Sequence, residues 1–331
     1  EITPLYIGQI HSQNIHYSNV EENDEKVEEI MTIGGAVETF AVGRNSKAPK
    51  SAGIDRDILD VPIPKEIFDI SVAGTASSYA PGAFTEAIDL PKIYDTSLFM
   101  DYWSPVDKYP QSTLFDWGDG GSLDDNLLIG VVRRGIKKVI LFQNCKAPLT
   151  PSDQWDPYDE NTPLTVDKLT WDFPYYFGRV PTDLSKLDEV AYDYTRNQIF
   201  KQEDFAPFVG GLQAAQATGK GAVYKMKLIT VENKWWGIEA GQEVELMVFY
   251  LSRAFTWETA LPKDLYHLLV PSKNDGQDDV TQGVKHGPFK NFPYYPTKGG
   301  NIDSEQSNAL AALESWIVKQ YQKDLQDLLM N

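Results

Sequence analysis

The sequence predicts an α/β protein, and three segments support this prediction. Residues 222–231 alternate between apolar and polar side chains, a pattern typical of a half-buried strand. Residues 139–142 form a β-branched and aromatic run with turn-forming residues on both sides, which indicates a buried strand. Residues 304–329 place apolar residues at three- to four-residue spacing after Asp303 or Ser304 as the N-cap, which predicts a helix. Together these segments predict a mixed sheet with helices on its faces.

The length and composition allow one large folded domain or two, and we predict a single domain over residues 1–331. The chain has 331 residues, of which 42% are hydrophobic and 12% aromatic, so its core can be large. Its net charge of −18 makes nucleic acids and anionic membranes poor partners, because both bind through surfaces that are rich in Lys and Arg.

Several features bear on the cellular compartment. Cys145 is the one cysteine, which excludes an intramolecular disulfide, and its place after an apolar run predicts a buried thiol. The sequence has no Asn-x-Ser/Thr glycosylation acceptor, no signal peptide and no apolar run of about eighteen residues that could form a transmembrane segment. We therefore expect a soluble protein and favour the cytoplasm. Since residue 1 is Glu rather than Met, we also expect that proteolytic processing or a cloning boundary sets this end.

The first third of the chain gives weaker patterns. Residues 1–20 predict a strand and a loop, and residues 21–29, with six acidic side chains, predict a solvated helix face or loop. In the excursion from 48 to 60, Ile54, Ile58 and Leu59 suggest a short helix. The small residues 72–78 predict a helix start that packs closely against the sheet, or alternatively one that binds an anion.

The later elements are clearer. Residues 127–134 predict a short helix, and residues 184–216 predict a longer helical segment. Between them, residues 148–181 are rich in Pro, Asp, Trp and Tyr without a clean period, which indicates an irregular, aromatic-rich cap or loop. Residues 243–251 predict a further strand, which we expect to pair antiparallel with residues 222–231.

The candidate functional residue is Asp119, which lies between glycines. Gly118, Gly120 and Gly121 allow positive φ angles and close approach of the backbone to a ligand, so the Asp119 carboxylate can be presented at the mouth of a sheet. Asn126 follows seven residues later. Asp-Gly alone is also the commonest tight-turn dipeptide, so a simple turn is the alternative.

The order of features around Asp119 resembles a known family. Asp-Gly-Gly, then Asn, an apolar helix, an Arg-Gly pair and a hydrophobic strand resemble the catalytic-Asp block of the patatin-like acylhydrolases. The similarity is closer to the branch that contains cytosolic phospholipases and fungal lysophospholipases (phospholipase B). Three more stretches resemble parts of that branch in the same order, namely residues 2–8, residues 73–78, and residues 292–297 followed by 308–316. The resemblance spans most of the chain but only the later half of the family's domain.

The resemblance implies a patatin-like mixed sheet and a Ser-Asp dyad, in which a serine in a Gly-x-Ser-x-Gly elbow attacks an acyl carbonyl. Asp119 matches the Asp that acts as the base. Gly120, Gly121 and Arg134 match positions near the substrate, and an Arg suits the phosphate of a phospholipid headgroup. It implies no cofactor. The substrate would be a phospholipid, a lysophospholipid or a related acyl lipid.

The matching serine is absent, since no Gly-x-Ser-x-Gly occurs in the 331 residues. Ser77, Ser78 and Ser122 are other serines in small-residue contexts, but none lies in a strand–turn–helix elbow. No metal-binding motif is present either. We therefore expect a companion polypeptide that carries the serine and completes the sheet.

A second function stays open. The chain could be a non-catalytic, phospholipase-derived subunit that binds a lipid or pigment or has a structural role in an assembly. Arg134 could likewise be a solvated side chain beside Arg133, Lys137 and Lys138.

Overall fold

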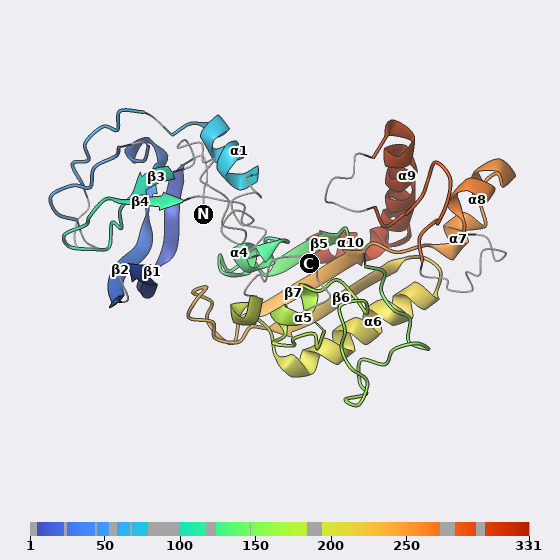
Figure 1. The fold of residues 1–331 in the computed structure, drawn as a ribbon. Helices are drawn as coiled ribbons and strands as arrows, with labels where there is room; N and C mark the ends of the chain where they lie inside the picture. Colours follow the sequence, from blue (N-terminus) through green and yellow to red (C-terminus); the bar gives the residue numbers. More distant parts are fainter. Residues whose placement is uncertain are drawn as a thin grey trace. The chain divides into compact units, whose positions relative to one another are not determined.

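The computed structural model describes residues 5–22, 25–43, 45–52, 58–66, 68–78, 99–116, 124–145, 147–183, 194–271, 282–295 and 302–330. The chain divides into two compact units, residues 1–123 and residues 124–331, and each is described by itself (Figure 1). The single domain over residues 1–331 stays a prediction.

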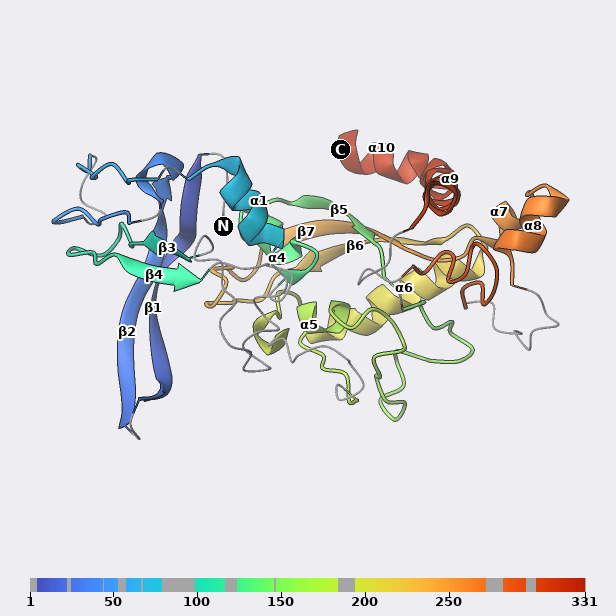
Figure 2. The same ribbon diagram turned by 45° about the horizontal axis from the view of Figure 1, so that its top comes forward.

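The first unit contains a long antiparallel hairpin. Strand β1 (Tyr6–Glu22) pairs with β2 (Glu25–Glu38), as Figure 2 shows. The strand expected near the N-terminus is confirmed. The helix or loop expected for residues 21–29 is wrong, because the described residues among them belong to these two strands. The ladder extends to the pair Glu22–Glu25, and its backbone hydrogen bonds form whatever charge the side chains carry.

The rest of this unit packs against the open end of the hairpin, opposite the end where Glu22 pairs with Glu25. The single-turn helix η1 (Thr39–Ala41) follows β2, and β3 (Phe99–Tyr102) pairs antiparallel with β4 (Thr113–Asp116). The hydroxyl of Tyr102 donates to the carbonyls of Gly34 and Gly35 at 3.2 and 3.0 Å. Among the described residues of this unit, one buried core cluster contains Ile7, Val37, Ala41, Val42, Ala52, Tyr102 and Trp103.

Helix α1 (Ile70–Ser78) confirms the predicted helix over the small residues. It begins where the Asp69 carboxylate accepts hydrogen bonds from the backbone nitrogens of Ser71 and Val72, at 2.8 and 2.9 Å. The predicted close packing is not seen at Gly74, where an added Cβ would meet no atom within 4 Å. The short helix suggested at Ile58 and Leu59 is absent, and Ile54 lies outside the described residues.

The second unit is built on a three-stranded mixed sheet in the order β5–β7–β6. The central strand β7 (Glu243–Tyr250) runs parallel to β5 (Lys138–Gln143) and antiparallel to β6 (Ala222–Ile229). These strands and the antiparallel pair confirm the predictions. β5 is less buried than predicted, because it is an edge strand in the described sheet and Phe142 is 50% exposed.

Helices cover both faces of this sheet, as Figure 2 shows. Leu246 and Val248 of β7 point to the core that contains Phe208 of α6 (Phe205–Ala217). Met247 and Phe249 point to the opposite core, which contains apolar residues of α9 (Ser304–Gln320) and α10 (Gln322–Met330). This alternation follows from the two-residue period of a strand. The unit also contains the short helices α7 (Phe255–Glu258) and α8 (Lys263–Leu269).

Two predicted helices differ in extent from the observed ones. The Asp303 cap is confirmed and forms a capping box with Gln306, but the helix is interrupted at Tyr321. In the segment 184–216, the helix is confirmed only from Phe205, after the single turns η4 (Tyr194–Arg196) and η5 (Gln202–Asp204). Residues 197–200 are not helical, because Phe200 instead forms a β-bridge with Thr230. Residues 184–193 lie outside the described residues.

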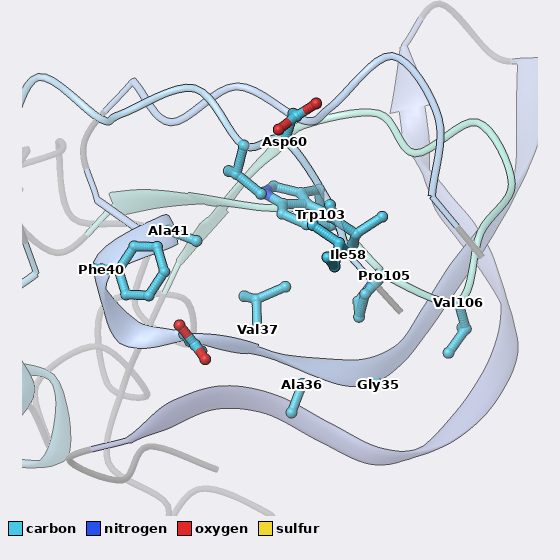
Figure 3. Close-up of a pocket in the computed structure, with 13 residues that line it drawn as sticks. Gly35, Ala36, Val37, Phe40, Ala41, Ile58, Asp60, Trp103, Pro105 and Val106 are labelled. Atoms are coloured by element: carbon cyan, nitrogen blue, oxygen red, sulfur yellow. The ribbon is translucent and has the colours of Figure 1, made fainter. Parts of the chain in front are cut away.

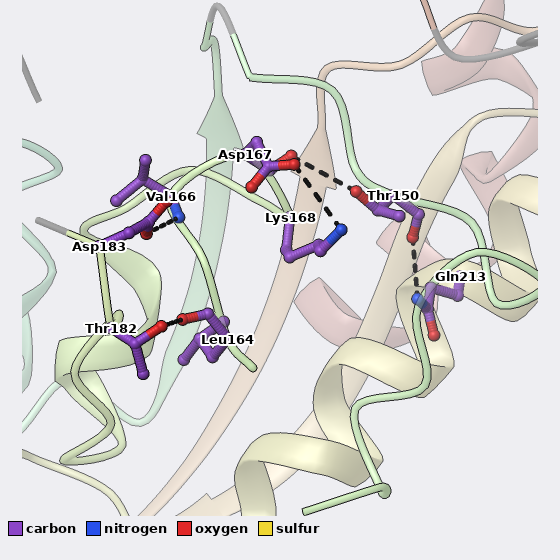
Figure 4. Close-up of polar contacts among 8 residues, drawn as sticks. All are labelled: Thr150, Leu164, Val166, Asp167, Lys168, Thr182, Asp183 and Gln213. Carbon is purple, nitrogen blue, oxygen red and sulfur yellow. Dashed lines mark hydrogen bonds and ion pairs between the residues drawn. The ribbon is translucent and has the colours of Figure 1, made fainter. Parts of the chain in front are cut away.

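The segment 148–181 is irregular, as predicted, with one short helix, α5 (Phe173–Tyr176). Many of its aromatic side chains are buried in the same core as α6, so it forms part of that core. Polar contacts stabilise it (Figure 4): Gln213 of α6 donates to the carbonyl of Thr150 at 2.8 Å, and Thr182 donates to the carbonyl of Leu164. In the described parts of the chain, no helix is both long and apolar enough to cross a membrane.

Candidate functional site

Three of the four predicted site residues, Asp119, Gly120 and Gly121, lie outside the described residues, as does Ser122. Arg134 is described. It is exposed and follows α4 (Leu128–Val132), and its backbone nitrogen donates to the carbonyl of Val131 at 3.2 Å. The position of Arg134 relative to Asp119 therefore stays a prediction. The backbones of Ser77 and Ser78 belong to α1, while their side chains lie outside the described part.

Asp124, five residues after Asp119, belongs to a partly buried polar arrangement. One oxygen of Asp124, Oδ2, accepts hydrogen bonds from the backbone nitrogens of Ile129 and Gly130 at 2.9 and 3.3 Å. These two donors belong to the first turns of α4, which explains why the helix predicted over residues 127–134 forms here. The other oxygen, Oδ1, accepts a hydrogen bond from the hydroxyl of Tyr176 at 2.8 Å.

Asn126 continues the arrangement. Its Nδ2 donates to Oδ2 of Asp172 and, at 3.4 Å, to the hydroxyl oxygen of Tyr176. The other carboxylate oxygen of Asp172 accepts a hydrogen bond from Thr170 Oγ1 at 2.6 Å. We call the set Asp124, Asn126, Thr170, Asp172 and Tyr176 the Asn126–Asp172 network. It ties the residues that directly follow the Asp-Gly-Gly block to α5.

Burial controls the charges in this network. Asp172 is 2% exposed, and burial raises its pKa to about 6, although the hydrogen bonds from Thr170 and Asn126 act in the opposite direction. Burial also raises the pKa of Asp124, and it raises that of Tyr176 well above its ordinary value. Tyr176 therefore remains a neutral donor at physiological pH.

A second buried group adjoins the network. The hydroxyl of Tyr250 donates to the carbonyl of Ala147 at 2.8 Å and accepts from the backbone nitrogen of Thr170 at 2.7 Å. The Cys145 thiol donates to the same carbonyl at 3.3 Å. Burial raises the pKa of Cys145 to about 12, so the thiol stays protonated and is not a nucleophile. The predicted buried thiol is confirmed.

Asp172 should make the protein less stable as the pH rises from about 4 to about 6. The unfolded chain loses this proton near pH 3.8 and the folded chain near pH 6, so the folded state binds more protons in between and the free energy of unfolding falls. We expect Asp172→Asn to remove up to about 3 kcal/mol of this dependence. Urea unfolding between pH 4 and pH 7 measures it, with the exposed Asp153→Asn as control. If the free energy of unfolding changed with pH by the same amount in the wild type and in Asp172→Asn, the expectation would be contradicted.

Sequence reasoning identified Asn126 but missed Thr170, Asp172 and Tyr176. The one local signal is Pro174, because Asp followed within two residues by Pro is typical of a helix start, and α5 begins there. Nothing local indicates that Asp172 contacts Asn126, since 46 positions separate them.

The network contains carboxylates, an amide and hydroxyls, but among the described residues no group of three or more His, Cys, Asp or Glu side chains could hold a metal ion. Its donors and acceptors are used to hold one another, so the network fixes residues 124–130 to residues 172–176. No family model matches the chain, and neither a curated protein nor a solved structure matches it.

Proposed function

We propose that the chain is a subunit of a lipid acyl-ester hydrolase with a patatin-like fold, in which Asp119 is the base of a Ser-Asp dyad and a companion polypeptide supplies the serine. The observation that carries this proposal is the Asn126–Asp172 network. A general base must lie within hydrogen-bond reach of the proton that it accepts, so its loop needs a firm attachment. Asp124 and Asn126 provide one within seven residues of Asp119.

The order of elements also agrees with the resemblance. The Asp-Gly-Gly block is followed by α4, by the Arg134-Gly135 pair and by strand β5. Gly135 has a φ of 71°, a conformation that glycine adopts without strain and that ends the helical stretch.

The proposed ester hydrolysis has two steps. Asp119 accepts the proton of the companion's serine hydroxyl while the serine oxygen bonds to the acyl carbon, and the leaving alcohol then departs with that proton. In the second step, Asp119 accepts a proton from water, the water oxygen bonds to the acyl carbon, and the serine is released with the proton. The acid product and the free dyad remain.

The proposed substrate is a phospholipid, a lysophospholipid or a related acyl lipid. Arg134 is an exposed cation on a chain with a net charge of −18. A guanidinium group can bind a phosphate through two parallel hydrogen bonds, which suits a phospholipid headgroup.

A fluorophosphonate probe tests where the nucleophile lies, because it reacts with a serine that a positioned base activates. The complete native assembly should be labelled on a companion polypeptide and not on residues 1–331. Mass spectrometry of the labelled peptides identifies the serine. A label on Ser77, Ser78 or Ser122 would contradict the companion, and a label on a serine of the same polypeptide outside residues 1–331 would contradict a separate chain but keep Asp119 as the base.

The second candidate is a non-catalytic subunit that binds a lipid or pigment or has a structural role. The specific observation in its favour is that residues 1–331 contain no Gly-x-Ser-x-Gly elbow. No labelling of any polypeptide in the native assembly would favour this candidate over the hydrolase.

A further inference from the structure

The first unit contains a pocket of about 800 Å³, shown in Figure 3. This volume lies within the range of roughly 300–1,000 Å³ that is common for small-molecule sites. Its lining comes from β2 and η1, from residues 58–61 and from residues 103–106. Most of the lining side chains are apolar, including Val37, Ile58, Trp103 and Val106.

One wall of the pocket is firmly built. Gly35 has a φ of 71°, and a Cβ added there would lie 2.6 Å from Cγ of Pro105, so only glycine allows β2 to approach this closely. The hydroxyls of Tyr102 and Ser104 donate to the backbone carbonyls of Gly35 and Gly34 at 3.0 and 2.8 Å. Trp103, between these two donors in sequence, is therefore held in the pocket's lining, where Figure 3 shows it between Asp60 and Val37.

The charged residues that line the pocket are both acidic. Glu38 and Asp60 are exposed carboxylates, and none of the described residues that line the pocket is basic. Among the aromatic residues of the lining, Phe40 is 63% exposed, whereas Trp103 is only 1% exposed. Aromatic faces and carboxylates both attract cations, and ammonium groups with apolar substituents suit such sites. An anion would meet two like charges there.

We propose that this pocket binds a cationic amphiphile, a molecule with an ammonium head group and an apolar tail. The head group lies near Glu38 and Asp60, and the tail packs against the apolar lining that includes Val37 and Val106. Ile58 and Phe40 are large apolar side chains that are 83% and 63% exposed, and a bound tail would cover them. This inference does not depend on Asp119 or on ester hydrolysis.

Three probes with the same ten-carbon chain test the proposal: decyltrimethylammonium, decanol and decanoate, each below the concentration at which it forms micelles. Isothermal titration calorimetry on the full chain should give the tightest binding for decyltrimethylammonium and the weakest for decanoate, with at least a tenfold difference between them. The preference should shrink as salt is added. Equal affinities, or tighter binding of decanoate, would overturn the proposal.

Matched variants distinguish binding in the pocket from attraction of the cation by the net negative charge of the chain. Asp60→Asn and Glu38→Gln should each weaken decyltrimethylammonium about threefold and leave decanol unchanged, because each removes one carboxylate. Asp153→Asn, an exposed carboxylate of the second unit, changes the net charge equally and should have no effect. An equal loss in all three variants would mean that only net charge matters, and would overturn the proposal. Melting curves check that each variant is folded.

Discussion

Replacing Asp119 with asparagine should lower ester turnover by the completed assembly about 10²- to 10⁴-fold, the contribution typical of a positioned general base. The amide is nearly isosteric with the carboxylate but cannot accept the serine proton. Folding should be unaffected, so the melting temperature of the assembly should match that of the wild type. Turnover of a chromogenic acyl ester and the melting temperature are measured on the same preparation.

Asp125→Asn is the matched control for Asp119→Asn. It makes the same chemical change in the same segment, and Asp125 is exposed. We expect its turnover to stay close to that of the wild type. If Asp119→Asn also left turnover unchanged, Asp119 would not be the base.

Glu258→Ala should cost about 3–5 kcal/mol of stability, because it would leave a buried guanidinium without its counterion. Arg253 and Glu258 are 7% and 4% exposed. Arg253 donates from Nε to Oε1 at 2.8 Å and from Nη2 to Oε2 at 2.6 Å, a bidentate geometry. The backbone nitrogen of Arg253 also donates to the Tyr294 hydroxyl at 3.4 Å, so the pair joins α7 to residues 292–295.

Glu243→Ala is the control for this effect. Glu243 accepts from Lys227 at 2.9 Å, but both side chains are more than half exposed, so we expect a much smaller loss than for Glu258→Ala. Urea unfolding of both variants beside the wild type measures the free energies. A similar small loss in both variants would show that the Arg253–Glu258 pair does not stabilise the fold in the expected way.

Local patterns were sufficient for the strands and helices whose burial repeats along the chain. β7 has an unbroken buried run from Leu246 to Tyr250 because it is the middle strand of a sheet with both faces covered, and α9 has a capping box at its start. The pattern failed where a distant partner decides the conformation. Ile199 and Phe200 are buried apolar residues that the sequence places in a helical segment, but their backbone nitrogens donate to the carbonyl of Tyr176, so no helix forms there.

In the candidate site, too, local features could be predicted and distant contacts could not. The Asp-Gly-Gly block and Asn126 were recognisable because they are consecutive features of one segment. The side-chain partners of Asn126 and Asp124 lie 46 to 52 positions away, within a segment without a clean period. The prediction for the acidic residues 21–29 was wrong for a different reason. Their charges favour solvent exposure, which a strand provides as well as a helix or a loop.

The sheet of the second unit has a consequence for the order in which the protein folds during translation. Lys138 of β5 pairs with Glu245 of β7, 107 positions later, whereas β6 and β7 are near neighbours and can form a local hairpin. At about 5–20 residues per second, a ribosome needs about 5–20 s to synthesise the intervening stretch. During that time β5, with Val139, Leu141 and Phe142, has emerged without its parallel neighbour. The nascent chain therefore exposes an apolar segment that molecular chaperones can bind before β5 pairs with β7.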